Sequence, residues 1–158
     1  MMRFIERIHD LLKDVPEDMP WDLEERLAEH PEALIIDVRE PDEFAFCHIE
    51  GSLNIPRGIL ESAAEWNFDE TEPELVRARE NSDRDVVVVC RSGHRSLLSA
   101  WSLQVLDYPR VLSLKTGLRG WNDFDQPMVD TAGEVVDPDQ IDAFFTSKLR
   151  EDQRQPGA

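Results

Sequence analysis

The segment that decides the fold is residues 86–96, with the sequence VVVVCRSGHRS. Its first four residues, Val86 to Val89, are β-branched and apolar, and they predict a short strand that is buried on both faces. The strand leads directly into Cys90, and a compact polar loop, Arg91 to Arg95, connects it to a helix expected to begin near Ser96. Because ligands bind at the carboxyl ends of strands in open parallel sheets, we expect the Cys90 thiol to lie at a binding edge.

Strand-like and helix-like patterns alternate on both sides of this segment. Three further apolar stretches predict strands, at residues 33–38, 53–55 and 111–114. Helices are expected at residues 4–15, from Pro20 to before Pro31, from Pro41, and near residues 59–66, 73–80, 96–105, 117–124 and 138–149. Strands that alternate with helices imply parallel crossovers, and therefore a three-layer α/β fold with a central sheet flanked by helices.

Two of the expected helices have apolar faces that can be assigned. The helix after the loop should turn inward Leu97, Leu98, Trp101 and Val105. The C-terminal helix should have Asp137 as its N-cap and Pro138 at its first position. Its apolar face should contain Ile141, Phe144, Phe145 and Leu149. Apolar stripes on the two terminal helices favour packing on the same domain, and a homodimer formed through them is the alternative.

The composition excludes several classes of function. Acidic residues outnumber basic residues by 34 to 17, and the net charge of −17 repels nucleic-acid backbones and anionic lipid surfaces. This acidity suits a protein made for high salt, and equally an ordinary soluble acidic protein.

Apolar runs fall far short of the roughly 20 residues of a membrane span, and the N-terminus lacks the apolar core of a signal peptide, so we expect a cytoplasmic protein. The two cysteines and four scattered histidines lack metal-ligand spacing, so we expect no metal and no organic cofactor.

The loop after the strand has the properties of a site for a sulfur anion. Successive backbone N–H groups in a strand–loop–helix turn point inward, and the helix dipole adds partial positive charge, so both favour the thiolate of Cys90. Arg91 and Arg95 add two local positive charges, and Gly93 allows a backbone conformation that a side chain would obstruct. A buried cysteine that merely ends a strand is the alternative, but the polar residues that follow are not core material.

Three ordered motifs resemble the rhodanese family of sulfurtransferases. Residues 34–56, LIIDVREPDEFAFCHIEGSLNIP, resemble its first signature, and residues 90–96 resemble its active-site loop. Residues 114–128 resemble its closing segment, with Gly117, Trp121 and Pro127 in place. The resemblance implies a mostly parallel five-stranded sheet and a cysteine that cycles between thiol and persulfide. It divides the chain into an N-terminal amphipathic helix at 1–19, a rhodanese-like domain at 20–128, and a C-terminal helix with a frayed tail at 129–158.

The length of the loop favours sulfur transfer over phosphoryl chemistry. Phosphatases and arsenate reductases of the same fold carry five residues between the cysteine and the arginine, whereas four residues separate Cys90 from Arg95. We therefore expect Cys90 to be the nucleophile. The residues expected to bind the substrate are Arg91, Ser92, Gly93, His94, Arg95 and Ser96. The expected donor is a small molecule such as thiosulfate or a persulfide, and the expected acceptor is cyanide or a thiol, including a thiol on a protein.

Residues outside the loop have weaker claims to a function. Asp37 and Arg39 are two apart at a strand end and are expected to support the loop, although an internal ion pair is the simpler interpretation. Cys47, Thr116 and Asp125 stand where the family usually has glycine, and the last two are expected to reshape the wall near the acceptor entrance. A role for Cys47 as a resolving thiol for Cys90 is disfavoured against a packed thiol.

Two other functions compete with sulfur transfer. A non-catalytic partner-binding module of the same fold usually loses its cysteine, whereas Cys90, Gly93 and Arg95 are all retained here. A phosphatase or an arsenate reductase is disfavoured by the length of the loop. Sulfur transfer through a Cys90 persulfide is therefore the leading hypothesis.

Overall fold

The computed structural model describes residues 3–81 and 83–157, and its strands form a five-stranded parallel sheet. The order across the sheet is β1-β5-β4-β2-β3. The strands are β1 (Glu17–Asp18), β2 (Leu34–Asp37), β3 (Leu53–Asn54), β4 (Val86–Val89) and β5 (Val111–Leu114). The predicted α/β fold is confirmed, and β4, which carries Cys90 at its carboxyl end, is the central strand.

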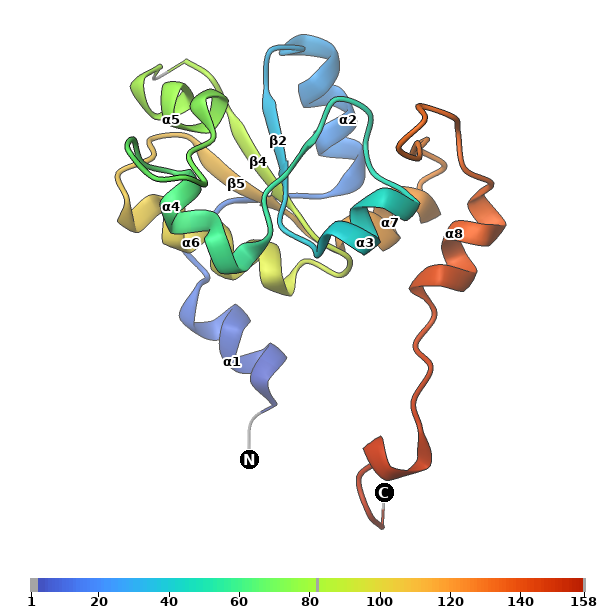
Figure 1. Ribbon diagram of the computed structural model, residues 1–158. Helices are drawn as coiled ribbons and strands as arrows, with labels where there is room; N and C mark the ends of the chain where they lie inside the picture. Colours follow the sequence, from blue (N-terminus) through green and yellow to red (C-terminus); the bar gives the residue numbers. More distant parts are fainter. Residues whose placement is uncertain (1–2, 82, 158) are drawn as a thin grey trace.

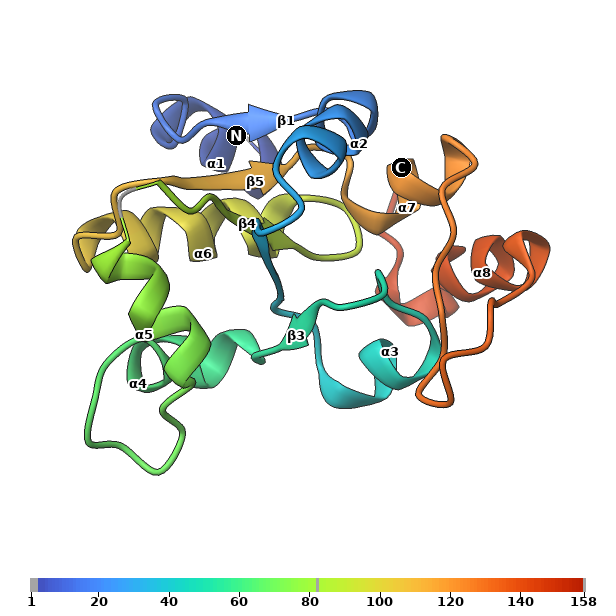
Figure 2. The ribbon, with the colours of Figure 1, turned by 90° about the horizontal axis from the view of Figure 1, so that it is seen from above.

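Helices cover both faces of the sheet and complete the three predicted layers. They are α1 (Phe4–Leu11), α2 (Pro20–Glu29), α3 (Pro41–Phe46), α4 (Leu60–Ala63), α5 (Pro73–Glu80), α6 (His94–Val105), α7 (Gly117–Asp123) and α8 (Pro138–Phe145), with short 3₁₀ turns at Arg57–Ile59 and Glu151–Gln153. Figures 1 and 2 show α4, α5 and α6 on one side of the strands and α2, α7 and α8 on the other. Among the described residues, no helix combines the length and the apolar character needed to cross a bilayer.

The alternation of side chains along β4 divides the core in two. Val86, Val88 and Cys90 face the α6 side, where they pack with residues of α4, α5 and α6. Val87 and Val89 face the opposite side and pack with residues of α2, α7 and α8. Because β4 is buried on both faces, Cys90 has a fixed position at the boundary between the core and the loop.

The edge strand β1 is not predicted by the sequence pattern. It consists of two acidic residues, Glu17 and Asp18, that pair in parallel with β5. Arg26 holds Asp18, with Nε donating to the carboxylate at 2.6 Å, and also donates to Asp85 at 2.8 Å. Arg110 donates to the same Asp85 carboxylate at 2.6 Å. Burial alone would raise the pKa of Asp85, but these hydrogen bonds outweigh it and lower the pKa below its ordinary value.

The inward face of α6 differs from the predicted one. The helix begins at His94, two residues earlier than expected, and Trp101 and Val105 are 47% and 60% exposed rather than buried. Its buried side chains are Ser96, Leu97, Ser99, Ala100 and Leu103. Leu97 is thus buried as predicted, and small residues at positions 96, 99 and 100 fit the close packing of α6 against β4 and β5.

The C-terminal helix α8 follows its predicted pattern in part. The Asp137 carboxylate accepts the N–H of Asp139 at 2.8 Å, as an N-cap should, and Ile141 and Phe145 are buried. Phe144 is 38% exposed and stacks on Phe46 of α3, while Leu149 lies beyond the helix and is 51% exposed. The helix therefore packs on its own domain through a narrower face than predicted.

Candidate functional site

Cys90 lies where β4 ends and lines a small cavity. The residue is only 1% exposed, but it lines a cavity of about 180 Å³. The other lining residues are Phe4, Arg91, Ser92, His94 and Arg95. Five of these six residues belong to the segment 90–96 singled out by the sequence, and Phe4, from α1, was not predicted.

The loop directs two backbone N–H groups at the sulfur atom of Cys90. Sγ accepts the N–H of Gly93 at 3.1 Å and the N–H of Ser96 at 3.3 Å. It also lies 3.4 Å from the Ser96 hydroxyl oxygen. Both N–H groups belong to the start of α6, where the helix dipole places partial positive charge. The environment of this buried sulfur is therefore polar and suited to a negative charge.

The carbonyl groups of the loop are held away from the sulfur by α7. The N–H of Leu118 donates to the carbonyl of Cys90 at 2.8 Å, and the N–H of Arg119 donates to that of Arg91 at 3.0 Å. This approach requires glycine at position 117, where a Cβ atom would lie 2.6 Å from the Cys90 carbonyl oxygen and still closer to the Arg91 carbonyl. With the carbonyl groups bonded to α7, the N–H groups of the loop remain directed at Sγ.

The two arginines of the loop have different environments. Arg91 is exposed, whereas Arg95 forms a bidentate ion pair with Glu43 of α3, through hydrogen bonds of 2.9 Å from Nη1 and Nη2. The hydrogen bond to Glu43 raises the pKa of Arg95. Burial alone would raise the pKa of Glu43, but Arg95 outweighs it and the pKa is lowered. The positive charge of Arg95 is thus balanced by Glu43, a residue not predicted because it lies 52 positions away in the sequence.

Asp37 and Arg39 form a buried ion pair at the end of β2, beside the end of β4. Arg39 Nη2 donates to the Asp37 carboxylate at 2.7 Å, both side chains are 0% exposed, and Nη2 also donates to the Cys47 carbonyl at 2.6 Å. The nearby His48 ring stacks on Phe44 at 3.8 Å, and its Nδ1 lies 2.8 Å from the Phe44 carbonyl oxygen. These contacts connect α3 and the following turn to the sheet, and so position the Glu43 that holds Arg95.

Comparisons with known proteins identify the family. The model of the rhodanese-like domain matches residues 19–124, which is more than half of the chain. The chain belongs to the rhodanese-like family. A sulfurtransferase of Allochromatium vinosum is 33% identical over 112 residues, covering 70% of this chain and 92% of the relative. A putative mitochondrial thiosulfate sulfurtransferase of Schizosaccharomyces pombe is 33% identical over 103 residues, covering 65% of this chain and 72% of the relative.

A solved structure of another protein shares the fold of this chain. A protein of unknown function from Rhodopseudomonas palustris, described as a possible tyrosine phosphatase, superposes with a TM-score of 0.70. Its sequence identity is 24%, and the match covers 81% of this chain and 96% of that chain. At this identity the likeness concerns the fold alone.

The two thiols of this rhodanese-like chain lie on opposite faces of the sheet. Cys90 belongs to the core on the α6 side, whereas Cys47 is buried in the core formed with α2, α7 and α8. Burial raises the pKa of the Cys47 thiol. This placement favours a packed thiol over a resolving thiol. Within residues 3–81 and 83–157, no three His, Cys, Asp or Glu side chains are arranged to hold a metal ion.

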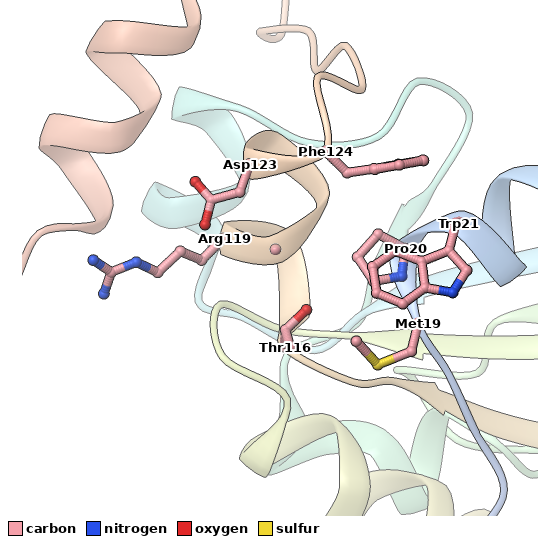
Figure 3. A pocket seen from close by; sticks show the side chains of 8 residues that line it. Met19, Pro20, Trp21, Thr116, Arg119, Asp123 and Phe124 are labelled. Atoms are coloured by element: carbon pink, nitrogen blue, oxygen red, sulfur yellow. The ribbon is translucent and has the colours of Figure 1, made fainter.

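Two departures from the family pattern keep a backbone typical of glycine. Thr116 and Asp125 have φ values of 68° and 59°, in the left-handed region that glycine adopts most readily. Thr116 also lines a second cavity, of about 310 Å³, together with Met19, Pro20, Trp21 and residues of α7 (Figure 3). The Trp21 and Phe124 rings meet edge to face there, with centroids 5.8 Å apart.

The N-terminal helix α1 forms one wall of the Cys90 cavity. It packs on α6, where the His94 ring lies edge to face with Phe4 at 6.3 Å and with His9 at 5.6 Å. Burial, followed by the neighbouring His9, lowers the pKa of His94. His94 is therefore packed between α1 and the loop, with one side on the cavity.

Proposed function

We propose that this rhodanese-like chain transfers sulfane sulfur through a persulfide on Cys90. The observation that carries the proposal is the pair of N–H groups, from Gly93 and Ser96, within 3.3 Å of Sγ. Such preorganised donors stabilise a charge that develops during a reaction, as they do in oxyanion holes. The names of the two relatives, both sulfurtransferases, support the same reaction class.

The first step loads the cysteine. The Cys90 thiolate attacks the outer sulfur of thiosulfate, a new S–S bond forms at Sγ, and the original S–S bond breaks. Sulfite leaves with the electron pair of the broken bond, and the outer sulfur of the new persulfide carries the negative charge. Arg91 is exposed on the wall of the cavity, where its charge favours the anionic donor and the departing sulfite. Arg95 fixes the loop through Glu43.

The second step unloads the cysteine. An acceptor thiolate, or cyanide, attacks the outer sulfur of the persulfide, and the Cys90 thiolate leaves with the electron pair. The products are an acceptor persulfide or thiocyanate, and the enzyme returns to its first state. The N–H groups of Gly93 and Ser96 stabilise Sγ as a thiolate both before and after the cycle.

The loop supports sulfur transfer rather than phosphoryl transfer. Four residues separate Cys90 from Arg95, and the cavity above Sγ is about 180 Å³. The Sγ hydrogen bonds from Gly93 and Ser96 show how tightly this short loop encloses the sulfur. Phosphatases and arsenate reductases of the same fold have five residues at this place, so the loop is one residue shorter than theirs and brings its N–H groups close around Sγ.

Steady-state assays of three proteins test the proposal. The wild-type chain should form thiocyanate from thiosulfate and cyanide, and Cys90→Ser should lose this activity by at least about a thousandfold, since the covalent step needs the thiolate. Cys47→Ser is the matched control and should retain activity, because Cys47 lies on the other face of the sheet. Full turnover by Cys90→Ser, or hydrolysis of an aryl phosphate without any sulfur transfer, would overturn the proposal.

A further inference from the structure

A buried serine on β5 extends the hydrogen bonds around Cys90. The Ser113 hydroxyl oxygen lies 2.7 Å from that of Ser96, which in turn lies 3.4 Å from Cys90 Sγ. Ser96 and Ser113 are both 0% exposed. The three side chains thus form a chain of hydrogen-bonding groups from the core to the sulfur.

Serine is unexpected at position 113. It lies in the middle of β5, on the side of the strand that also carries Val111, in the core of the α6 side. A hydroxyl group buried in such a place is costly unless it is hydrogen-bonded, and Ser113 meets this requirement through Ser96. The role of the Ser113 side chain is therefore tied to Ser96, the residue that contacts Cys90.

The direction of the hydrogen bonds in this chain depends on the state of the sulfur. A thiol can donate its hydrogen to Ser96 Oγ, which then donates to Ser113 Oγ. A thiolate has no hydrogen to donate, so the Ser96 hydroxyl can rotate and donate to Sγ. Ser96 Oγ is then free to accept the hydroxyl hydrogen of Ser113, since either atom of this pair can be the donor.

We propose that Ser96 and Ser113 form a two-hydroxyl switch that reverses direction when Cys90 becomes charged, with Ser113 as a positioning residue. In the charged state Sγ accepts three hydrogen bonds, from the N–H groups of Gly93 and Ser96 and from the Ser96 hydroxyl. The switch moves hydroxyl hydrogens by rotation only. The thiol proton leaves Cys90 for solvent through the cavity, so no proton passes along the serines.

Ser113 strengthens the bond that Ser96 makes to the sulfur. A hydroxyl that accepts a hydrogen bond becomes a better donor, and a bond to an ion is roughly twice as strong as a neutral one. Removal of the Ser113 hydroxyl should therefore weaken the charged state more than the neutral state. This inference deepens the proposed function and rests on Cys90 acting as a thiolate.

The charged groups around Cys90 are unaffected by a change at position 113. They are Arg91 in the loop, His94 and Arg95 on α6, Glu43 on α3, and the Asp37–Arg39 pair on β2. Lys115 after β5, Glu17 of β1 and His9 of α1 line a neighbouring cavity together with Gly93 and His94. A neutral substitution at Ser113 alters none of these charges.

The test is the pH dependence of Cys90 alkylation by iodoacetamide, followed by mass spectrometry of the Cys90 peptide. In Ser113→Ala we expect the midpoint of the pH–rate profile to move up by about half to one pH unit. Ser52→Ala is the matched control, because Ser52 is a buried serine bonded to the Ile49 carbonyl at 2.6 Å and is remote from the loop. Its profile should coincide with that of the wild type.

A double-mutant cycle separates the switch from a purely structural role. In the Ser96→Ala background, Ser113→Ala should produce no further movement of the midpoint, because its effect passes through Ser96. The same movement in both backgrounds, or an unchanged midpoint in a folded Ser113→Ala protein, would refute the switch. If Ser113→Ala fails to fold, Ser113→Thr retains the hydroxyl and should match the wild type, and a raised midpoint there would count against the switch. Alkylation needs no sulfur donor, so this result is independent of whether sulfur transfer is observed.

Discussion

The ion pair between Glu43 and Arg95 gives a prediction whose magnitude follows from the structure. Glu43→Gln keeps the shape of the side chain but leaves one hydrogen bond from the guanidinium to a neutral amide oxygen in place of two bonds of 2.9 Å to a carboxylate. The side chains of Arg95 and Glu43 are 34% and 26% exposed, so solvent screens the pair in part. Fully exposed pairs contribute about 0.2–1 kcal/mol and hydrogen bonds to charged groups about 1.5–3 kcal/mol. We therefore expect the free energy of unfolding to fall by about 1–2 kcal/mol near neutral pH.

The pH dependence of this loss of stability gives a second test of the ion pair. The pKa of Glu43 is lowered in the folded chain, so its stabilising effect is present above the ordinary pKa of a glutamate and is lost as the pH falls through the folded pKa. The free energies of unfolding of wild type and Glu43→Gln, measured with urea, should therefore differ less at about pH 3 than at about pH 7.

A matched substitution controls for the helix cap. Glu43 also accepts the N–H of Glu40 at 2.9 Å, as Asp22 accepts that of Met19 at 3.0 Å at the start of α2. Among the described residues Asp22 has no arginine partner, so Asp22→Asn measures the cap alone. Equal losses for the two variants at neutral pH, or a Glu43→Gln loss that does not change with pH, would refute the reasoning.

Three further predictions concern the backbone, the second thiol and the surface charge. Thr116→Gly should raise the free energy of unfolding, measured by urea titration, by about 1 kcal/mol, because glycine adopts the left-handed backbone of this position without strain. A fall in the free energy of unfolding would show that the contacts of the threonine side chain contribute more than the strain costs. Treatment with diamide should leave Cys47 and Cys90 without a disulfide between them, because they face opposite sides of the sheet, and a paired loss of both thiols within one chain would contradict this placement. The net charge of −17 should make moderate salt raise the second-order rate with thiosulfate, whereas a steep fall with salt would mean that Arg91 dominates the approach of the donor.

The parts of the fold that the sequence predicts are those encoded by local patterns. The run Val86 to Val89 predicts a buried strand because β-branched residues favour strands and the run is too short for a helix. The strand β4 is found at these residues. Prolines at 20, 41, 73 and 138 mark helix starts in the structure as well. The same local signals place Cys90 at the carboxyl end of this strand, whereas the central place of β4 in the sheet is known only from the structure.

The remaining features depend on contacts between distant segments. The two acidic residues of β1 form a strand only because β5 offers an unpaired edge and Arg26 holds Asp18. The inward face of α6 is predicted only in part: Leu97 is buried, but Trp101 and Val105 are exposed. Hydrophobic periodicity cannot show that the helix lies close enough to the sheet to need small residues at several inward positions. Glu43 and Ser113 approach the loop from other elements, so no local signal marks either of them.

The most direct test of the central claim is the intact mass of the chain after a single treatment with thiosulfate, with released sulfite measured in the same sample. A Cys90 nucleophile held by the N–H groups of Gly93 and Ser96 should gain one sulfur atom per chain, mapped to Cys90, with one sulfite released for each. Cys47→Ser should give the same result, and Cys90→Ser should gain no sulfur. A wild-type chain that takes up no sulfur, or sulfur bound equally well by Cys90→Ser, would contradict the account.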